Sequence, residues 1–178
     1  MNKIDQLKAL VKRDAVKFGK FILSSGKESD IYVDLRKVTL NPAGASAIGS
    51  LVYDIIKDRG IQAVGGMSIG ADPIAVAVSL AAYQAGAEIM AFLVRKTQKG
   101  HGTGNVIEGP VQPGLRALVV EDVITTGAST ISAIERVREA GMEVDLVVAL
   151  FDRLEGGRAA IEACGVEVRS LLNRSDLG

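Results

Sequence analysis

The sequence predicts an α/β fold with a central, mainly parallel sheet flanked by helices, and two observations lead to this prediction. Short apolar runs rich in β-branched residues recur along the chain: QAVGG (62–66), IMAFLV (89–94), RALVVED (116–122) and VDLVVALF (144–151). Helical periodicity at about 42–58, 72–86 and 128–140, or turns, separate these runs. Continuous apolar runs are typical of parallel strands that helices cover on both faces. Strands and helices that alternate along the chain are typical of α/β domains.

The two ends of the chain extend this arrangement. The N-terminal stretch MNKIDQLKALVKRDAVKFG has apolar residues at helical spacing and predicts an amphipathic helix. Two alternating segments, FILS and IYVDLR, flank the polar turn SGKES and predict an antiparallel hairpin, which we call the hood. GGRAAIEACG predicts a further helix and VEVRSLL a last strand. We expect one domain over residues 1–178, with the N-terminal helix and hood in about residues 1–40.

The composition excludes several classes of function. Lys and Arg number 21, as do Asp and Glu, so no global field would draw the chain to nucleic acid or to an anionic membrane. The most apolar stretch, IAVAVSLAAYQAGA, is shorter than the ~20 residues that a bilayer crossing needs. The single cysteine, Cys164, fits a reducing compartment. We expect a cytoplasmic protein that binds neither nucleic acid nor membrane.

The stretch VVEDVITTGAST (119–130) combines two features that seldom occur together. A strand ends in Glu121 and Asp122, and a Thr/Gly turn then leads into a helix whose first N–H groups suit an anion. A ribose phosphate satisfies both features, because the turn binds its phosphate while the acids accept hydrogen bonds from its hydroxyls or hold hydrated Mg²⁺. The alternative is that the acids cap the helix and the threonines fill a loop. Two unpaired charges at the end of a buried strand are costly, which favours the ligand site.

The segment RKTQKGHGTGNVIEG (95–109) predicts a basic lid at the same sheet edge. Arg95, Lys96, Lys99 and His101 place three fixed cations and one imidazole among glycines. Such a lid would stabilise charge on a leaving pyrophosphate and exclude water. A solvated basic loop is the alternative, and the position of the segment after the strand IMAFLV favours the lid.

Several spaced motifs together resemble the orotate phosphoribosyltransferase family over nearly the whole length. They are FILSSGKESDIYVDLRK, RKTQKGHGTGNVIEG, EDVITTGAST and FDR, in that order. The acidic turn alone resembles the phosphoribosyl pyrophosphate (PRPP) motif of all type I phosphoribosyltransferases. The resemblance implies the type I phosphoribosyltransferase fold, transfer of the 5-phosphoribosyl group from PRPP to orotate, and a role in pyrimidine biosynthesis.

The resemblance also implies roles for individual residues. The catalytic residues would be Lys99, His101 and Asp122. The residues that bind PRPP would be Lys27, Arg95, Lys96, Lys99, His101, Glu121, Asp122, Thr125, Thr126, Gly127, Ala128 and Ser129. Those that bind orotate would be Lys27, Thr125 and Arg153, and a guanidinium pairs well with a carboxylate.

The resemblance further implies a homodimer and a cofactor. Arg95, Lys99 and His101 would act in the neighbouring subunit's site, and Lys96 in its own. Mg²⁺ would arrive on PRPP without a direct protein ligand and contact Glu121 and Asp122 through water.

One segment departs from the common family pattern. GGMSIGADPIA (65–75) has Ile69 and Gly70 where many members carry an aromatic residue and a lysine. Backbone amides and Asp72 remain to bind phosphate or metal. A turn with Asp72 as N-cap and Pro73 at the first helical position is equally compatible with the sequence.

The expected chemistry is displacement of pyrophosphate from the anomeric carbon by a nitrogen of orotate, aided by positioning and charge neutralisation. Two alternatives remain at this point. One is a phosphoribosyltransferase for another base, and the other is a non-catalytic PRPP-binding regulator.

Overall fold

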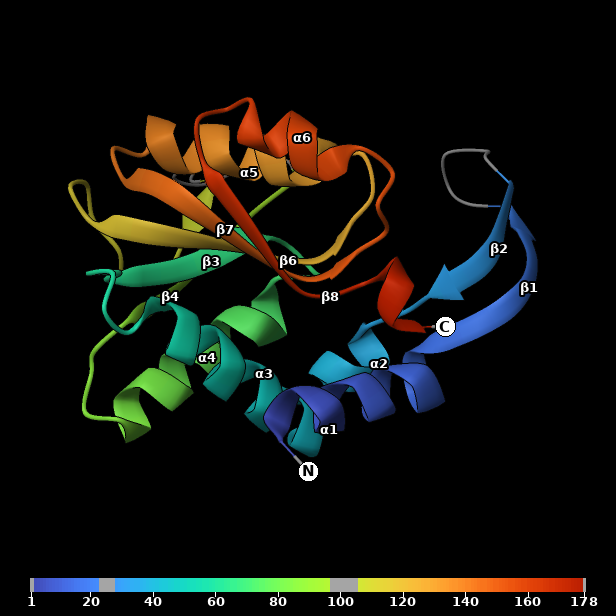
Figure 1. Ribbon diagram of the computed structural model, residues 1–178. Helices are drawn as coiled ribbons and strands as arrows, with labels where there is room; N and C mark the ends of the chain where they lie inside the picture. Colours follow the sequence, from blue (N-terminus) through green and yellow to red (C-terminus); the bar gives the residue numbers. More distant parts are fainter. Residues whose placement is uncertain (1, 23–27, 97–105, 178) are drawn as a thin grey trace.

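The computed structural model describes residues 2–22, 28–96 and 106–177. Within this part of the chain a central sheet has the strand order β5-β4-β3-β6-β7-β8 (Figure 1). Its strands are β3 (Ala63–Met67), β4 (Met90–Val94), β5 (Ile107–Glu108), β6 (Arg116–Ile124), β7 (Glu143–Asp152) and β8 (Glu167–Asn173). All neighbours pair in parallel except β5, which runs antiparallel to β4. The mainly parallel sheet is therefore confirmed.

Helices cover both faces of this sheet (Figure 1). On one face lie α1 (Lys3–Leu10), α3 (Pro42–Ile56) and α4 (Asp72–Gln84). On the other face lie α5 (Ala128–Glu139) and α6 (Gly157–Glu162). The sequence predicted α3 to α6 within a few residues of these bounds. None of the described helices combines the length and apolarity that a membrane crossing requires.

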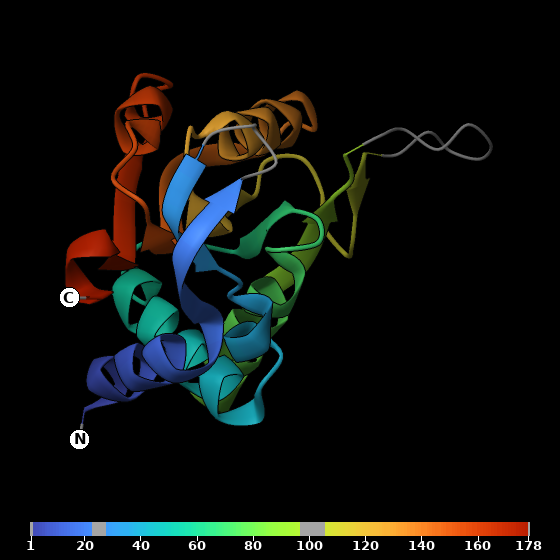
Figure 2. The same cartoon turned by 90° about the vertical axis from the view of Figure 1, so that its right-hand side faces the viewer.

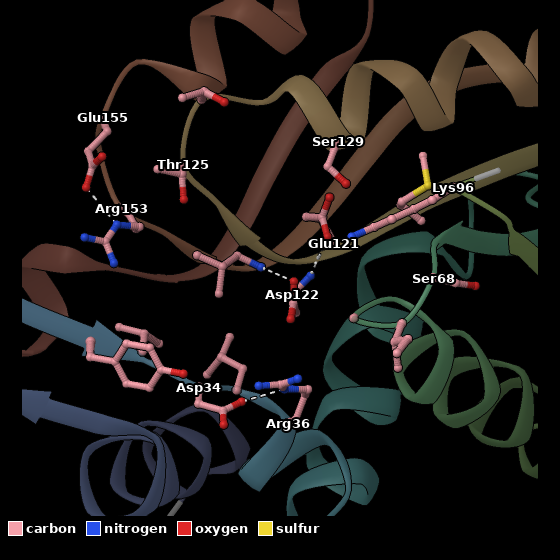
Figure 3. A pocket seen from close by; sticks show the side chains of 18 of the residues that line it. Asp34, Arg36, Ser68, Lys96, Glu121, Asp122, Thr125, Ser129, Arg153 and Glu155 are labelled. Carbon is pink, nitrogen blue, oxygen red and sulfur yellow. Dashed lines mark hydrogen bonds and ion pairs between the residues drawn. The ribbon is translucent and has the colours of Figure 1, made fainter. Parts of the chain in front are cut away.

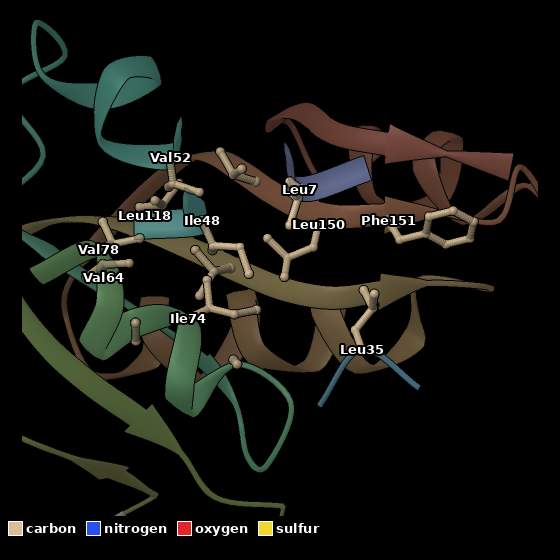
Figure 4. Packing of buried hydrophobic residues seen from close by; sticks show 14 of the residues in the cluster. Leu7, Leu35, Ile48, Val52, Val64, Ile74, Val78, Leu118, Leu150 and Phe151 are labelled. Carbon is tan, nitrogen blue, oxygen red and sulfur yellow. The ribbon is translucent and has the colours of Figure 1, made fainter. Parts of the chain in front are cut away.

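The core has two parts, one on each face of the sheet. On the α3/α4 face, Ile48, Val52 and Val78 pack against Val64 and Leu118 of the sheet (Figure 4). On the opposite face a second apolar cluster joins the sheet to α5 and α6. Strand β3 is buried along its whole length, as expected of a strand that helices cover on both sides. The carboxyl ends of the strands are thereby held at one edge of a rigid scaffold.

The N-terminal region differs from the prediction in its boundaries. The predicted helix ends sooner, because α1 passes into a π-helical turn, η1 (Val11–Ala15), and β1 (Val16–Ile22) begins at Val16. Val16 pairs with Val33 of β2 (Glu28–Val33), so the antiparallel partner decides the state of a segment whose helix propensity is weak. The predicted strand IYVDLR also ends early, because α2 (Arg36–Thr39) begins at Arg36.

The antiparallel hood is confirmed as the two-stranded sheet of β1 and β2. Figure 2 shows the hood in front of the central sheet, on the side of its carboxyl ends. The 3-10 turn η2 (Arg174–Leu177) contacts it there, because Arg174 donates to both carboxylate oxygens of Asp30 at 2.9 and 2.7 Å. The hood and the sheet edge thus face each other across a cavity.

Candidate active site

A cavity of about 740 Å³ lies between the hood and the carboxyl ends of the central strands. The segments after β3, β4, β6 and β7 line it, and β1, β2 and the residues leading into α2 close the opposite side. In an open α/β sheet this edge is where ligands bind. Polar side chains from separate parts of the sequence converge there (Figure 3).

The acidic pair divides into a buried and an accessible carboxylate. Glu121 is 5% exposed and accepts a hydrogen bond from the Thr130 hydroxyl at 2.9 Å. Burial, followed by the neighbouring Asp122 carboxylate, raises the pKa of Glu121 to about 8. Asp122 is less buried, lines the cavity and accepts a hydrogen bond from the Val123 N–H at 2.8 Å. Both carboxylates line the cavity, and Asp122 is the more accessible of the two to a ligand.

The departure from the family pattern at Gly70 has a local steric basis. A Cβ atom at position 70 would lie 2.6 Å from Cγ of Asp122 and 2.7 Å from each of its oxygens. Any side chain at this position would displace the carboxylate, so Gly70 makes room for Asp122. Ile69, which is 72% exposed, lines the cavity beside it.

Asp72 does not cap α4, contrary to one of the two interpretations of this segment. Ala71 occupies the N-cap position, and Asp72 is the first helical residue. Its carboxylate instead accepts a hydrogen bond from the Ser68 hydroxyl at 2.9 Å. Burial raises the pKa of Asp72, although the Ser68 hydrogen bond opposes this effect. Ser68, which the sequence did not single out, thereby joins the cavity wall and α4.

The Thr/Gly turn forms the N-terminal end of α5. Gly127 has φ +84° and is the N-cap residue, and Ala128 begins the helix. Thr125, Thr126 and Ser129 line the cavity. The first N–H groups of an α-helix lack intrahelical acceptors and carry a partial positive charge, so this end of α5 suits a phosphate.

Among the described residues, three cations line the cavity, and one of them, Arg36, was not predicted from the sequence. Arg36 donates to Asp34 at 2.8 Å, and the amine of Lys96 points toward the acidic pair (Figure 3). Arg153 is 6% exposed, and its Nε donates to Glu155 at 2.7 Å. A buried guanidinium beside a cavity is a strong site for a planar anion. The sequence did not indicate a binding role for Arg36, because its segment was predicted to be a strand of the hood.

Other predicted residues lie elsewhere. Arg95 donates to Glu108 at 2.9 Å and is not among the described residues that line the main cavity. Lys27, Lys99 and His101 lie outside the described residues. Among the residues that the structure describes, no group of three His, Cys, Asp or Glu side chains could hold a metal ion.

Comparison with known proteins identifies the family, although no family model matches the chain. The chain is 44% identical to orotate phosphoribosyltransferase of Rhodopirellula baltica over 176 residues, which cover 96% of this chain and 91% of that protein. It is 46% identical to the enzyme of the same name from Streptomyces avermitilis, over 94% of this chain and 93% of the relative. The chain belongs to the orotate phosphoribosyltransferase family. It is thus an enzyme with the type I phosphoribosyltransferase fold, and the regulator suggested by the acidic turn alone gains no support.

A solved orotate phosphoribosyltransferase shows the same architecture. The Mycobacterium tuberculosis enzyme in complex with PRPP superimposes with a TM-score of 0.85 at 40% identity, and the match covers 99% of each chain. The hood, the sheet and the flanking helices of this chain are therefore those of an orotate phosphoribosyltransferase.

Proposed function

We propose that this chain transfers the 5-phosphoribosyl group of PRPP to orotate, giving orotidine 5-phosphate and pyrophosphate for UMP synthesis. The observation that carries the proposal is the cavity, which brings together a phosphate-binding turn, an accessible carboxylate and a buried arginine. Each group matches one part of the two substrates. Family membership supports the same substrates.

The turn and the acidic pair would bind the ribose 5-phosphate. Thr125, Thr126 and Ser129, with the backbone of Gly127 and Ala128, would surround the phosphate at the start of α5. Asp122 would accept hydrogen bonds from the ribose hydroxyls. Glu121, which also lines the cavity and is bonded to Thr130, would contact the ribose beside Asp122.

Lys96, with the backbone of the Ser68–Gly70 segment, would bind the pyrophosphate. Mg²⁺ bound to PRPP would neutralise charge on this leaving group. The donor set fits an ion carried by the substrate, because Asp122 faces the cavity as an oxygen ligand that can act through water. Asp72, which bonds to Ser68, lies behind the same segment.

Arg153 would bind the carboxylate of orotate, with Thr125 as a second contact to the base. Its bond to Glu155 fixes the guanidinium plane at the cavity wall. The ring nitrogen of orotate would then attack the anomeric carbon as pyrophosphate departs. Orotate is already an anion at neutral pH, so the protein's contribution is orientation and charge stabilisation.

The remaining roles rest on the sequence resemblance. Lys27 would contact PRPP and orotate, and Lys99 and His101 would act on pyrophosphate across a homodimer interface. Arg95 would act with Lys99 and His101 in the neighbouring subunit. Its position supports this role, because it is not among the described residues that line the main cavity of its own subunit. The single cysteine supports a cytoplasmic location.

The test is loss of orotate absorbance when the purified chain is mixed with PRPP and Mg²⁺. We expect loss only when all components are present, and at least a 10²-fold lower rate in Lys99→Ala, as for other groups that stabilise transition-state charge. Absorbance that stays constant while PRPP still binds by calorimetry would contradict orotate as the acceptor.

Arg153→Ala tests the orientation of the base. We expect kcat/KM for orotate to fall about 10²-fold, the size of a lost hydrogen-bonded charge pair, with little change in PRPP affinity. Arg158→Ala is the control, because Arg158 donates to Glu162 and to the Val168 carbonyl on α6 and β8, outside the lining of the cavity. Equal losses in the two variants would refute the role of Arg153.

A further inference from the structure

Arg136 on α5 joins this helix to the end of β4. Its Nη1 donates to the carbonyl of Arg95, and its Nη2 donates to the carbonyl of Lys96 at 3.0 Å. The two acceptors are consecutive, so the fork of one guanidinium binds both. Arg136 itself does not line the main cavity.

The position of Lys96 depends on few other backbone contacts of the described residues. The strand β4 ends at Val94, and the last backbone bond of that pairing runs from the Arg95 N–H to the Val106 carbonyl at 2.9 Å. Lys96 lies one residue further, and its side chain enters the cavity (Figure 3). Its carbonyl bond to Arg136 therefore fixes the backbone from which the amine extends.

The same helix also holds the opposite side of the site. Thr130, in its first turn, bonds to Glu121 of β6, and Arg136 lies less than two turns later, about 9 Å along the axis. One rigid element thus connects the acidic pair and phosphate turn to Lys96, which fixes the distance between them.

We infer that Arg136 is a positioning residue for the phosphoribosyl transfer: it holds the Lys96 backbone so that the amine meets the pyrophosphate end of the donor. This inference rests on the proposed function. It predicts that loss of Arg136 weakens PRPP binding while the KM for orotate stays unchanged, because Arg153, the main contact to the base, follows β7, whereas Arg136 bonds to the segment after β4.

Arg138 provides a matched control on the same helix. It also donates to two backbone carbonyls, those of Cys164 and Val144, each at 3.0 Å. Neither residue lines the cavity. Removing Arg138 therefore deletes the same chemical group and the same number of bonds without touching Lys96.

The experiment measures PRPP affinity by calorimetry and kcat/KM for PRPP in Arg136→Ala, Arg138→Ala, Lys96→Ala and the double variant R136A/K96A. We expect Arg136→Ala to lower both about tenfold, within the 10²-fold that a 1 Å misplacement can cost, and Arg138→Ala to change them less than about twofold. In the Lys96→Ala background the Arg136 effect should shrink to less than about twofold, because the two residues act as a unit.

Equal effects of Arg136→Ala and Arg138→Ala, or an undiminished Arg136 effect without Lys96, would overturn the inference. Calorimetry measures PRPP binding independently of the acceptor base. A failure of this inference can therefore be distinguished from a wrong assignment of orotate as the acceptor. If Arg136→Ala does not fold, Arg136→Lys and Arg138→Lys replace the pair, since lysine keeps the charge but not the fork.

Discussion

At the scale of single residues, Glu121 and Asp122 show how adjacent groups of one type acquire different roles. Successive side chains of a strand point to opposite faces, and both residues lie within β6. Glu121 therefore meets Thr130 of α5, whereas Asp122 meets Gly70 on the other side. Both residues line the cavity, as the prediction of a shared ligand requires, but they are held by different elements and differ in burial.

The raised pKa of Glu121 leads to a prediction about stability. Between its unfolded pKa, near 4.5, and its folded pKa of about 8, the folded state holds the extra proton. The free energy of unfolding of the ligand-free chain should therefore fall as pH rises through this window. Glu121→Gln keeps a partner for Thr130 without a charge, so it should remove this dependence and be more stable than the parent at pH 9.

Urea unfolding at pH 5, 7 and 9 measures this effect. Glu135→Gln, at an exposed position of α5, is the control and should leave the parent's slope unchanged. Parallel slopes for the parent and Glu121→Gln would show that the buried carboxylate does not control the pH response.

At the scale of elements, the turn before α5 depends on a glycine for two separate reasons. Gly127 has φ +84°, and a Cβ atom there would lie 2.8 Å from the Gly157 carbonyl and 2.9 Å from Cγ1 of Ile161. Gly114 has φ +86°, but nothing lies within 4 Å of its Cβ position. An alanine at either position would carry the same backbone strain, but only at position 127 would its Cβ atom also clash with neighbouring atoms.

We expect Gly114→Ala to cost about 1–2 kcal/mol of stability, the price of a left-handed L-residue. Gly127→Ala should cost at least roughly 1 kcal/mol more, because α6 must shift, and it should also weaken PRPP binding. Thermal unfolding and calorimetry with PRPP measure the two effects. Identical stabilities of the two variants would show that the packing of α6 against the turn is loose.

The elements that could be predicted are those whose state is decided locally or by burial. Strands β3, β4, β6 and β7 are apolar enough to be recognised alone, and α3 to α5 have clear periodicity. The strand β5, with two residues, is too short for any period, and β1 depends on its pairing with β2. The contacts of Arg136 join elements far apart in sequence, and Arg36 reaches the cavity only once the hood is folded against the sheet, so neither leaves a local pattern.

At the scale of the whole molecule, the proposed homodimer can be tested by mixing defective subunits. Arg153→Ala damages a subunit's own site, and Lys99→Ala would damage its neighbour's. After random exchange, about half of the dimers are mixed and each has one intact site, so about a quarter of the sites should work. Activity should return from near zero when the two inactive variants are mixed after mild dissociation.

No recovery, despite subunit exchange shown by differently tagged chains, would mean that Lys99 acts within its own subunit. Mixing either variant with itself under the same conditions is the control.

The arrangement of the cavity also has an evolutionary consequence. Arg153 stands after β7, whereas the phosphate turn follows β6 and Lys96 follows β4. The main contact to the acceptor thus lies on a different loop from most contacts to the donor, and these loops can accumulate mutations separately while the apolar interior stays constant. A lineage with this scaffold could change which nucleobase it joins to the activated sugar, while the residues that bind that sugar would be inherited unchanged.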